Sequence, residues 1–387
     1  MIGTQAGFDR RVLSALDASP SRIPVVLGGC GSGRSSLLAH LSEWAGRSAY
    51  LIDVERSATT PERFTEAVLA SSPIAWHGRT HVATSPRDAF DQFLAFLDSA
   101  RGPAGEPCLF LLDEAFELRT FENFPGLRHV LHDLVEAIAT SENRFVLTSR
   151  YTARAHRLLR EAPARFEVMH ITPMGVPEVI DHLAPAFNHY EQMATGDRDF
   201  LGRAVQALSD GRPVYVDALA KAMAGQGLGP ADPVAALSGL LARGGALDAW
   251  CRFRYELRLH RARGYGALKA ILDILADEEP LTLTEISLRL HRTPGSTKDY
   301  LSWLEDVDLV TVRQKRYTFS DPILRLWVGL HCRPVAPSDE AVAREVQRFA
   351  VARIPEPTMA YAATAAADAG GDAARDDRRN WGIIEID

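Results

Sequence analysis

The stretch GGCGSGRSS (Gly28–Ser36) decides how the rest of this sequence is interpreted. It follows the short apolar run IPVVL (23–27), which predicts a strand, and it opens SSLLAHL (35–41), whose apolar spacing predicts a helix. Counted from Gly28, the spacing is that of G-x-x-x-x-G-K-[ST], with Arg34 in the position of the lysine. We therefore predict a glycine-rich loop that joins a strand to a helix.

Such a loop has a specific chemistry. Glycines allow the backbone to turn its N–H groups toward one point, and the start of the following helix adds a partial positive charge. The loop is therefore expected to bind the phosphates of ATP or ADP, with the Ser35 hydroxyl as a ligand of Mg²⁺. The predicted nucleotide-binding residues are Gly28, Gly29, Cys30, Gly31, Ser32, Gly33, Arg34, Ser35 and Ser36.

Arg34 departs from the motif, and the chain offers no nearby lysine in its place. The four lysines all lie at or beyond Lys221. Arginine presents a larger, planar fork than the compact lysine ammonium. Two interpretations stay open: Arg34 does the work of the lysine, or hydrolysis is weak or absent and the site serves as a nucleotide-binding switch.

A second acidic motif follows about 80 residues later, in the run CLFLLDE (Cys108–Glu114). A nearly pure apolar run predicts a strand buried on both faces of a parallel sheet. Asp113 would then be aimed at the Mg²⁺ shell, and Glu114 would polarise the attacking water.

The next predicted strand, FVLTSR (Phe145–Arg150), ends in polar and basic residues. Adjacent parallel strands bring their carboxyl ends to one crevice. Thr148 or Ser149 is expected to touch the γ-phosphate or water, and Arg150 to report the γ-phosphate as a third catalytic candidate beside Glu114 and Arg34. The alternative is an ordinary strand exit into an arginine-rich helix.

The first 170 residues alternate strand and helix patterns, which predicts an α/β fold with a parallel sheet. The predicted strands are 23–28, 49–53, 108–113, 145–149 and 166–171, and the predicted helices include 35–44, 86–100, 127–140 and 153–161. From Val176 to Arg263 the pattern is helical only, with Pro177 and Pro213 each at a helix start.

The three motifs, in this order, resemble the AAA+/STAND P-loop ATPases, and most closely the archaeal-type ATPases and the NB-ARC branch. The resemblance covers roughly residues 1–330 and implies a helical lid that carries a G-x-P motif. Gly211-Arg212-Pro213-Val214 falls where that motif belongs. The resemblance implies that Pro213 packs near the adenine and that Arg212 approaches the phosphates. Arg119 and Arg154 are weak candidates for an arginine finger.

The segment after the lid predicts a winged helix-turn-helix domain. A helix over 266–276 is followed by a capping box at Thr282-Leu283-Thr284-Glu285, a third helix from Ser296 with Thr293 as its N-cap, and a hairpin around Gln314-Lys315. The predicted domains are an α/β core (1–172), a lid (173–263), a winged helix (264–334) and an extension (335–387) whose low-complexity tail is expected to be disordered. For the terminal WGIIEID, a loose tail is favoured over a short docking segment.

Whether the winged helix binds DNA is left open by its charges. Lys298, Arg313, Lys315 and Arg316 would neutralise phosphates, and Ser296, Thr297 and Tyr300 lie on the helix that would enter a groove. The same helix region holds Asp299, Glu305, Asp306 and Asp308. The alternative is a packing module for a protein partner, self-association or the rest of the chain.

Bulk properties exclude several other classes. The 387 residues carry a formal net charge of −7, which gives no global positive field. The four cysteines are widely spaced, no stretch approaches 18 apolar residues, and the first residues lack a signal peptide, so we expect a cytoplasmic protein without a membrane span. A metal pair at His77 and His81 is disfavoured against a loop, and no G-x-S-x-G elbow supports a hydrolase.

The sequence thus favours an ATP-dependent molecular switch in which nucleotide state moves the lid and the winged helix. The rival hypothesis is a DNA-binding transcriptional regulator whose nucleotide site is structural and does not turn over.

Overall fold

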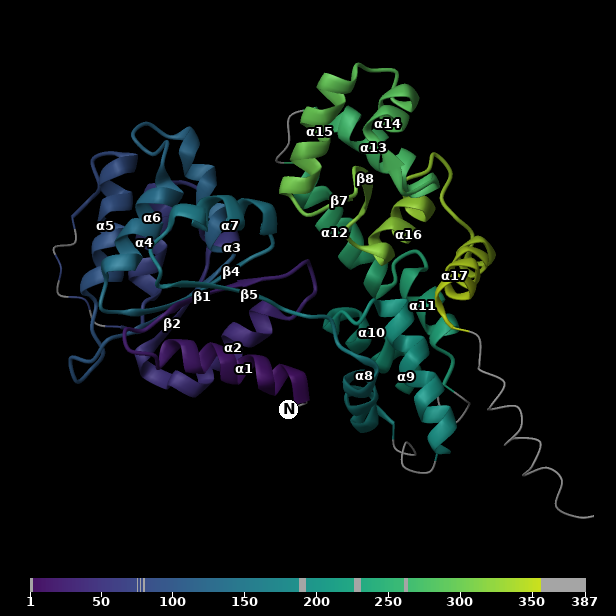
Figure 1. The fold of residues 1–387 in the computed structure, drawn as a ribbon, viewed down its shortest axis with the longest axis horizontal. Coiled ribbons are helices and arrows are strands. Elements are labelled where there is room, and N and C mark those ends of the chain that lie inside the picture. Colours follow the sequence, from purple (N-terminus) through teal and green to yellow (C-terminus); the bar gives the residue numbers. More distant parts are fainter. Residues whose placement is uncertain are drawn as a thin grey trace, which may run out of the picture.

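The fold has two lobes, an α/β lobe and a largely helical lobe (Figure 1). The computed structural model of the chain describes residues 3–74, 76, 78, 81–187, 193–225, 231–260 and 264–355. Residues 356–387, with the predicted tail and its WGIIEID segment, lie outside the described residues, as does His77.

The α/β lobe is built on a parallel sheet with the strand order β2-β3-β4-β1-β5. The five predicted strands are all present, with ends that differ by one residue at most: β1 (Ile23–Leu27), β2 (Ala49–Asp53), β3 (Leu109–Asp113), β4 (Arg144–Ser149) and β5 (Phe166–His170). In the pairing register Asp53 faces Asp113, and Val26 faces Thr148. The carboxyl ends of four neighbouring strands therefore meet at one edge of the sheet.

Helices cover both faces of this sheet, because its strand residues point alternately to each side. Val26, Leu111 and Val146 join a core with α1 and α2, whereas Val25, Leu112 and Leu147 join the core under α4–α6. Figure 1 shows these two layers below and above the strands. The helical elements of this lobe are α1 (Gly3–Leu16), α2 (Arg34–Ala45), η1 (Gly46–Ser48), α3 (Val54–Ser57), α4 (Pro61–Ser71), α5 (Pro86–Ser99), η2 (Ala115–Asn123), α6 (Val130–Thr140), α7 (Thr152–Leu158) and η3 (Leu159–Glu161).

The region predicted to be helical only is helical throughout its described part. Pro177 lies in the first turn of its helix and Pro213 begins another, as expected. These elements are α8 (Val176–Leu183), η4 (Ala184–Ala186), α9 (Thr195–Ser209), α10 (Pro213–Ala224), α11 (Pro233–Leu241) and α12 (Ala246–His260).

The C-terminal part has the predicted order of three helices and a hairpin. Thr282 and Glu285 form the capping box, and Thr293 caps the third helix through its hydroxyl. A short strand pairs with the hairpin in the antiparallel order β6-β8-β7. The elements are α13 (Tyr265–Asp277), β6 (Leu281–Thr282), α14 (Leu283–Arg289), α15 (Pro294–Asp306), β7 (Val310–Arg313), β8 (Arg316–Phe319), α16 (Pro322–His331) and α17 (Asp339–Arg353).

Two predicted helices are shorter by three or more residues at one end. The helix expected from Leu127 begins at Val130, after a turn in which His129 is the N-cap residue. The third helix of the C-terminal part, expected over 296–310, ends at Asp306, because Asp308 adopts a φ of 57° and Val310 already belongs to the hairpin. Both shifts change where side chains point, and the second brings Asp308 to the interface between the lobes.

Within the described residues, no helix is both long and apolar enough to cross a membrane. The same part of the chain contains no cluster of three or more His, Cys, Asp or Glu side chains placed for a metal ion. His81 instead lies 2.9 Å from Asp88, Nε2 to Oδ1. All four cysteines are free thiols.

The buried amide of Asn143 is expected to be a main stabiliser of the sheet. It accepts a hydrogen bond from Cys108 N at 2.9 Å and donates to the carbonyls of Leu97 (2.8 Å) and Ala100 (3.1 Å). Asn143→Ala leaves buried backbone groups unpaired and should lower the free energy of unfolding by about 2–4 kcal/mol. Urea unfolding measures this, with exposed Asn123→Ala as a control that should change stability by less than about 0.5 kcal/mol.

Candidate functional site

The glycine-rich loop runs from the end of β1 to the start of α2, at the carboxyl edge of the sheet. Gly31 and Gly33 adopt φ values of 76° and 92°, in a left-handed region that residues with a side chain rarely adopt. A Cβ atom on Gly31 would lie 2.3 Å from Cγ1 of Val214, on the first turn of α10. The loop thus requires glycine both for its curl and for its contact with the helical lobe.

Ser35, Asp113 and Thr148 form a chain of hydrogen bonds across three elements. The Ser35 hydroxyl donates to Asp113 Oδ2 at 2.6 Å, and the Thr148 hydroxyl donates to Asp113 Oδ1 at 2.5 Å. The hydroxyl oxygen of Thr148 also accepts from the backbone N–H of Glu114 at 3.0 Å. The predicted pair of Mg²⁺ ligands, Ser35 and Asp113, is therefore in direct contact.

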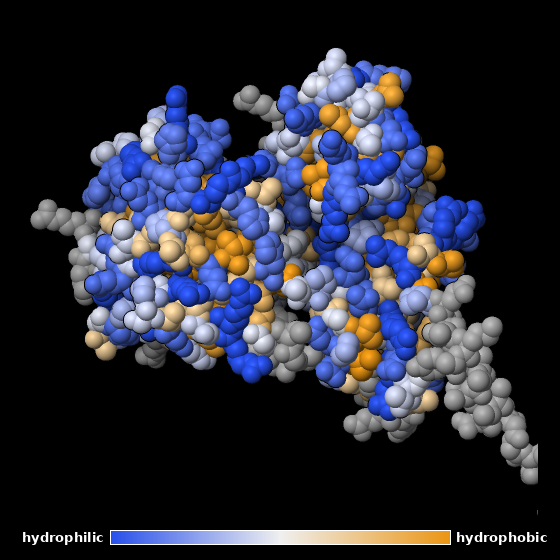
Figure 2. All heavy atoms as spheres, in the orientation of Figure 1, coloured by the Kyte–Doolittle hydropathy of each residue, from blue (hydrophilic) through white to orange (hydrophobic). Residues whose placement is uncertain are grey.

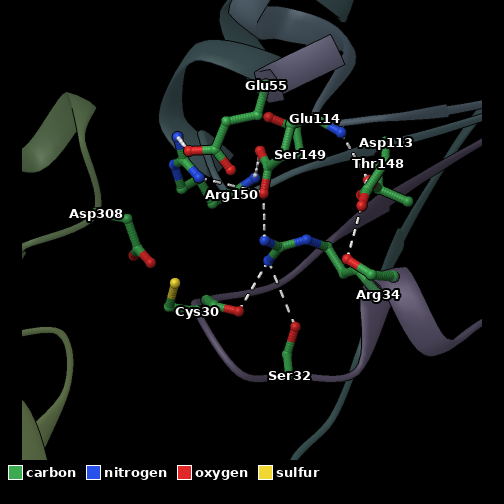
Figure 3. Close-up of polar contacts among 12 residues, drawn as sticks. Cys30, Ser32, Arg34, Glu55, Asp113, Glu114, Thr148, Ser149, Arg150 and Asp308 are labelled. Atoms are coloured by element: carbon green, nitrogen blue, oxygen red, sulfur yellow. Dashed lines mark hydrogen bonds and ion pairs between the residues drawn. The ribbon is translucent and has the colours of Figure 1, made fainter. Parts of the chain in front are cut away.

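Arg34 and Glu114 form a buried ion pair (Figure 3). Arg34 Nη2 lies 2.5 Å from Glu114 Oε1, and Nη1 donates to the Gly29 carbonyl at 2.8 Å. Their side chains are 7% and 6% exposed. Burial by itself favours the neutral acid, yet the charges of Arg34 and Arg150 lower the pKa of the Glu114 carboxyl below its ordinary value. Glu114 is therefore an anion held by two arginines.

Arg150 lies behind this pair and is surrounded by the carboxylates of three glutamates. Its Nη2 donates to Glu55 Oε1 at 2.9 Å and to Glu117, and its backbone N–H donates to Glu114 Oε2 at 3.1 Å. Burial lowers the pKa of an arginine, but these carboxylates more than offset it and raise the pKa of Arg150 well above its ordinary value. In this arrangement Arg150 fixes Glu114 from the side opposite the loop.

The loop forms one wall of a cavity of about 540 Å³. Residues of the helical lobe form another wall, including Pro213, Val214 and Trp250. Trp250 packs edge-on against Tyr215, with ring centroids 5.4 Å apart. Asp113 and Glu114 line the cavity beside the loop residues Cys30 to Ser36, whereas Arg150 and Thr148 lie behind that wall. The volume is in the range of small-molecule sites.

Arg212 fastens the loop to the helical lobe. Its Nη1 donates to the Cys30 carbonyl at 3.0 Å and to Asp321 Oδ2 at 3.2 Å, and Nη2 donates to the Ser320 carbonyl. Tyr215 donates its hydroxyl to the same Asp321 carboxylate at 2.6 Å. One side chain thus joins the loop, the start of α10 and the segment after the hairpin.

The other predicted residues are placed as follows. Arg119 and Arg154 flank the ring of Tyr151, at 5.0 Å and 5.6 Å from its centroid, and Arg154 also pairs with Asp306 at 2.9 Å. Burial raises the pKa of the Tyr151 hydroxyl to about 12. Both arginines therefore serve contacts within the chain.

Several residues of the site were missed from the sequence. Glu55 follows β2 by two residues, so the rule that strand ends converge, applied to β2 as well, would have found it. Trp250, Arg258 and Asp308 come from the helical lobe, and no sequence pattern signals their approach to the loop.

The basic residues that were predicted to contact DNA, on α15 and the hairpin, lie on the surface. Lys298, Arg313 and Lys315 are exposed, and within the described residues no ion-pair partner is found for them. Arg316 instead donates to the Pro280 carbonyl at 3.0 Å and lies 3.9 Å from Glu285. The surface over this part of the molecule is largely hydrophilic (Figure 2).

The sheet order, the loop at the end of β1 and the Asp-Glu pair at the end of β3 define an AAA+-type P-loop ATPase fold. The chain is similar in structure to a Walker-type ATPase of Pyrococcus abyssi, with a TM-score of 0.60 and 18% identity over 83% of this chain and 94% of that one. No protein-family model and no curated protein matches the sequence.

More distant likenesses have TM-scores below 0.5 and support no inference about this chain. They include the RuvB Holliday junction branch migration motor of Thermotoga maritima, with a TM-score of 0.43 and 13% identity over 82% of this chain and 92% of that one. Another is the ORC1 protein of Aeropyrum pernix in complex with DNA, with a TM-score of 0.45 and 15% identity over 90% and 93%.

The Arg212–Asp321 pair should stabilise the join between the lobes. Arg212→Ala leaves the 4%-exposed Asp321 carboxylate without its guanidinium and should lower the free energy of unfolding by about 3–5 kcal/mol. Thermal or urea unfolding measures this. Lys221→Ala, which removes an exposed pair with Asp217, is the control and should cost at most about 0.5 kcal/mol. An equal loss in the two variants would contradict the role of Arg212.

Proposed function

We propose that this chain is an ATP-binding switch of the AAA+/STAND type, in which the nucleotide lies between the α/β lobe and the helical lobe. The observation that carries the proposal is the curled loop whose Arg34 and Ser35 contact Glu114 and Asp113 in the lining of one cavity. The predicted division into core (1–172), lid (173–263), winged helix (264–334) and extension (335–387) is part of this proposal.

The residues present fit a magnesium nucleotide. Backbone N–H groups of the loop and the N-terminus of α2 would hold the phosphates, and Arg34 would neutralise them. Ser35 and Asp113 would hold Mg²⁺, which supplies positive charge to the phosphate oxygens when bound. Pro213, Val214 and Trp250 offer an apolar wall for the base. Arg212 would act on the phosphates through its hold on the Cys30 carbonyl.

Glu114 is the proposed general base. In the ion pair with Arg34 its carboxylate is already occupied, so it can orient water only after Arg34 turns toward a phosphate. Arg150 and Thr148 would then keep Glu114 and Asp113 in place, through the hydrogen bonds at 3.1 Å and 2.5 Å. Arg150 would thus act as a positioning residue that responds to the γ-phosphate through Glu114.

Nucleotide binding is tested by calorimetry with ATP or ADP in the presence of Mg²⁺. Arg34→Ala should weaken ATP binding by about 10- to 100-fold, because a charge-assisted contact to phosphate is lost. Arg144→Ala, which removes a surface arginine paired with Asp17 at 3.5 Å, should leave binding unchanged. Failure of the wild type to bind either nucleotide would refute the proposal.

Hydrolysis is tested separately by phosphate release. Glu114→Gln should keep nucleotide binding and lower turnover by about 10²- to 10⁴-fold, since a general base is removed. Arg34→Lys distinguishes the two interpretations of the loop. If the wild type does not turn over and Arg34→Lys does, the natural protein is a binding switch and its assignment as an ATPase fails.

The exposed basic residues on the hairpin and α15 favour DNA binding as a second candidate function. Lys298, Arg313 and Lys315 protrude from the part of the chain that would be the winged helix, and none is used in an ion pair within the described chain. A regulator whose nucleotide site does not turn over would use these residues on phosphates.

A salt-titrated gel shift tests this candidate. Replacing Lys298, Arg313 and Lys315 by alanine should weaken DNA binding and reduce the slope of log K against log salt by about one unit for each charge removed. Arg316→Ala serves as a comparison, because Arg316 is already engaged with Pro280 and Glu285 and should change the slope less. If the wild type shows no salt-dependent DNA binding, the proposed winged helix would serve as a packing module instead.

A further inference from the structure

Asp308 brings a carboxylate from the C-terminal part of the chain to the phosphate loop. It follows α15 with a φ of 57°, and its backbone carbonyl accepts a hydrogen bond from Arg258 Nη1 at 2.9 Å. A Cβ atom on Gly29 would lie 3.4 Å from Asp308 Oδ2 and 3.4 Å from Arg212 Nη1. Figure 3 shows this carboxylate on the far side of Cys30 from Arg34, approaching the loop from a separate segment.

The surroundings of Asp308 are rich in buried arginine. Arg258 of α12 is 4% exposed, and its Nε and Nη2 have no hydrogen-bond partner within the described residues. Burial raises the pKa of the Asp308 carboxyl, although four positive charges oppose that rise, those of Arg258, Arg212, Arg34 and Arg150. The cluster thus has spare donor capacity, which is expected where an anion is bound.

The Asp308 side chain makes no described contact that would explain its position by structural stabilisation. Its carboxylate forms no ion pair within 4.0 Å among the described residues, whereas Asp306, two residues earlier, pairs with Arg154 at 2.9 Å and Arg157 at 3.0 Å. Bringing a carboxylate out of water without a direct partner is costly. The charge of Asp308 is therefore balanced only by the arginine cluster as a whole.

We propose that the Asp308 carboxylate competes with the nucleotide phosphates for this arginine cluster, so that docking of the C-terminal part and nucleotide binding oppose each other. The proposal rests on the proposed function of the loop. The C-terminal part is held on the α/β lobe near Asp308 by the pair of Asp306 with Arg154 of α7, and on the loop side by the pair of Asp321 with Arg212. A phosphate bound at the loop would repel Asp308, which lies between these two pairs, and so weaken the docking. By linkage, the free energy with which a phosphate weakens docking equals that with which docking weakens phosphate binding.

The test is calorimetric titration of full-length protein with ATP and Mg²⁺. Asp308→Asn removes the charge, keeps the size, and is compatible with the positive φ, which asparagine tolerates well. It should bind ATP about tenfold more tightly or better, as expected for removal of one charge beside a phosphate. Asp308→Gly, which also accepts this φ, should give the same direction if the asparagine variant folds poorly.

Asp299→Asn is the control, and Asp306→Asn tests the linkage separately. Asp299→Asn removes an exposed charge from α15 and should leave the affinity unchanged. Asp306→Asn weakens docking at α7, so by the same linkage it should also tighten ATP binding, although by less than Asp308→Asn because the Asp308 charge stays beside the loop.

The outcomes are distinct. Tighter binding by both Asp308 variants, without a gain from Asp299→Asn, supports the competition. Equal affinity of the wild type and both Asp308 variants overturns it and leaves the proposed function intact, and weaker ATP binding by Asp306→Asn also overturns it. If neither wild type nor variant binds nucleotide, the proposed function fails and the competition fails with it.

Discussion

The ion pair between Arg34 and Glu114 is the interaction on which the rest of the site depends. It joins the loop after β1 to the end of β3 across the crevice, with both side chains almost wholly buried. Two charges out of water are stable only when their remaining donors and acceptors are also satisfied. Here the Gly29 carbonyl and the backbone N–H of Arg150 supply two of those partners, whereas Arg34 Nε has none within the described residues. The pair thus holds the loop and the end of β4 together.

An arginine in this position changes what the loop can do. A lysine ammonium is a point charge that can be drawn from one anion to another with little change of shape. The Arg34 fork reaches the Gly29 carbonyl with one arm and Glu114 with the other, so each partner constrains the geometry offered to the second. In the proposed function, release of Glu114 and capture of a phosphate by Arg34 would therefore be one movement, which suits a switch better than a fast enzyme.

Much of the fold could be predicted from the sequence, because local patterns decided it. The apolar runs at 23–27 and 109–113 occur as strands, and the proline and threonine starts of helices are found where expected. Ser35 and Asp113, which the two motifs predict to share a Mg²⁺ ion, lie in direct contact. Sequence could not show that Arg34 would be held by Glu114, or that Arg150 would face three acids, since these contacts join residues 33 to 95 positions apart.

The acids of α15 show most clearly where sequence reasoning stops. As charges on a helix that faces DNA, Asp306 and Asp308 only weaken the case for DNA binding. In the structure both face the α/β lobe, where Asp306 pairs with Arg154 and Asp308 lies beside Gly29. The cause is the end of α15 at Asp306, after which the backbone turns through a positive φ and aims the next carboxylate at the loop. If that turn were absent, the helix would carry the Asp308 carboxylate away from the loop. The nucleotide site and the C-terminal part are thus electrostatically coupled through a two-residue turn, whatever that part binds.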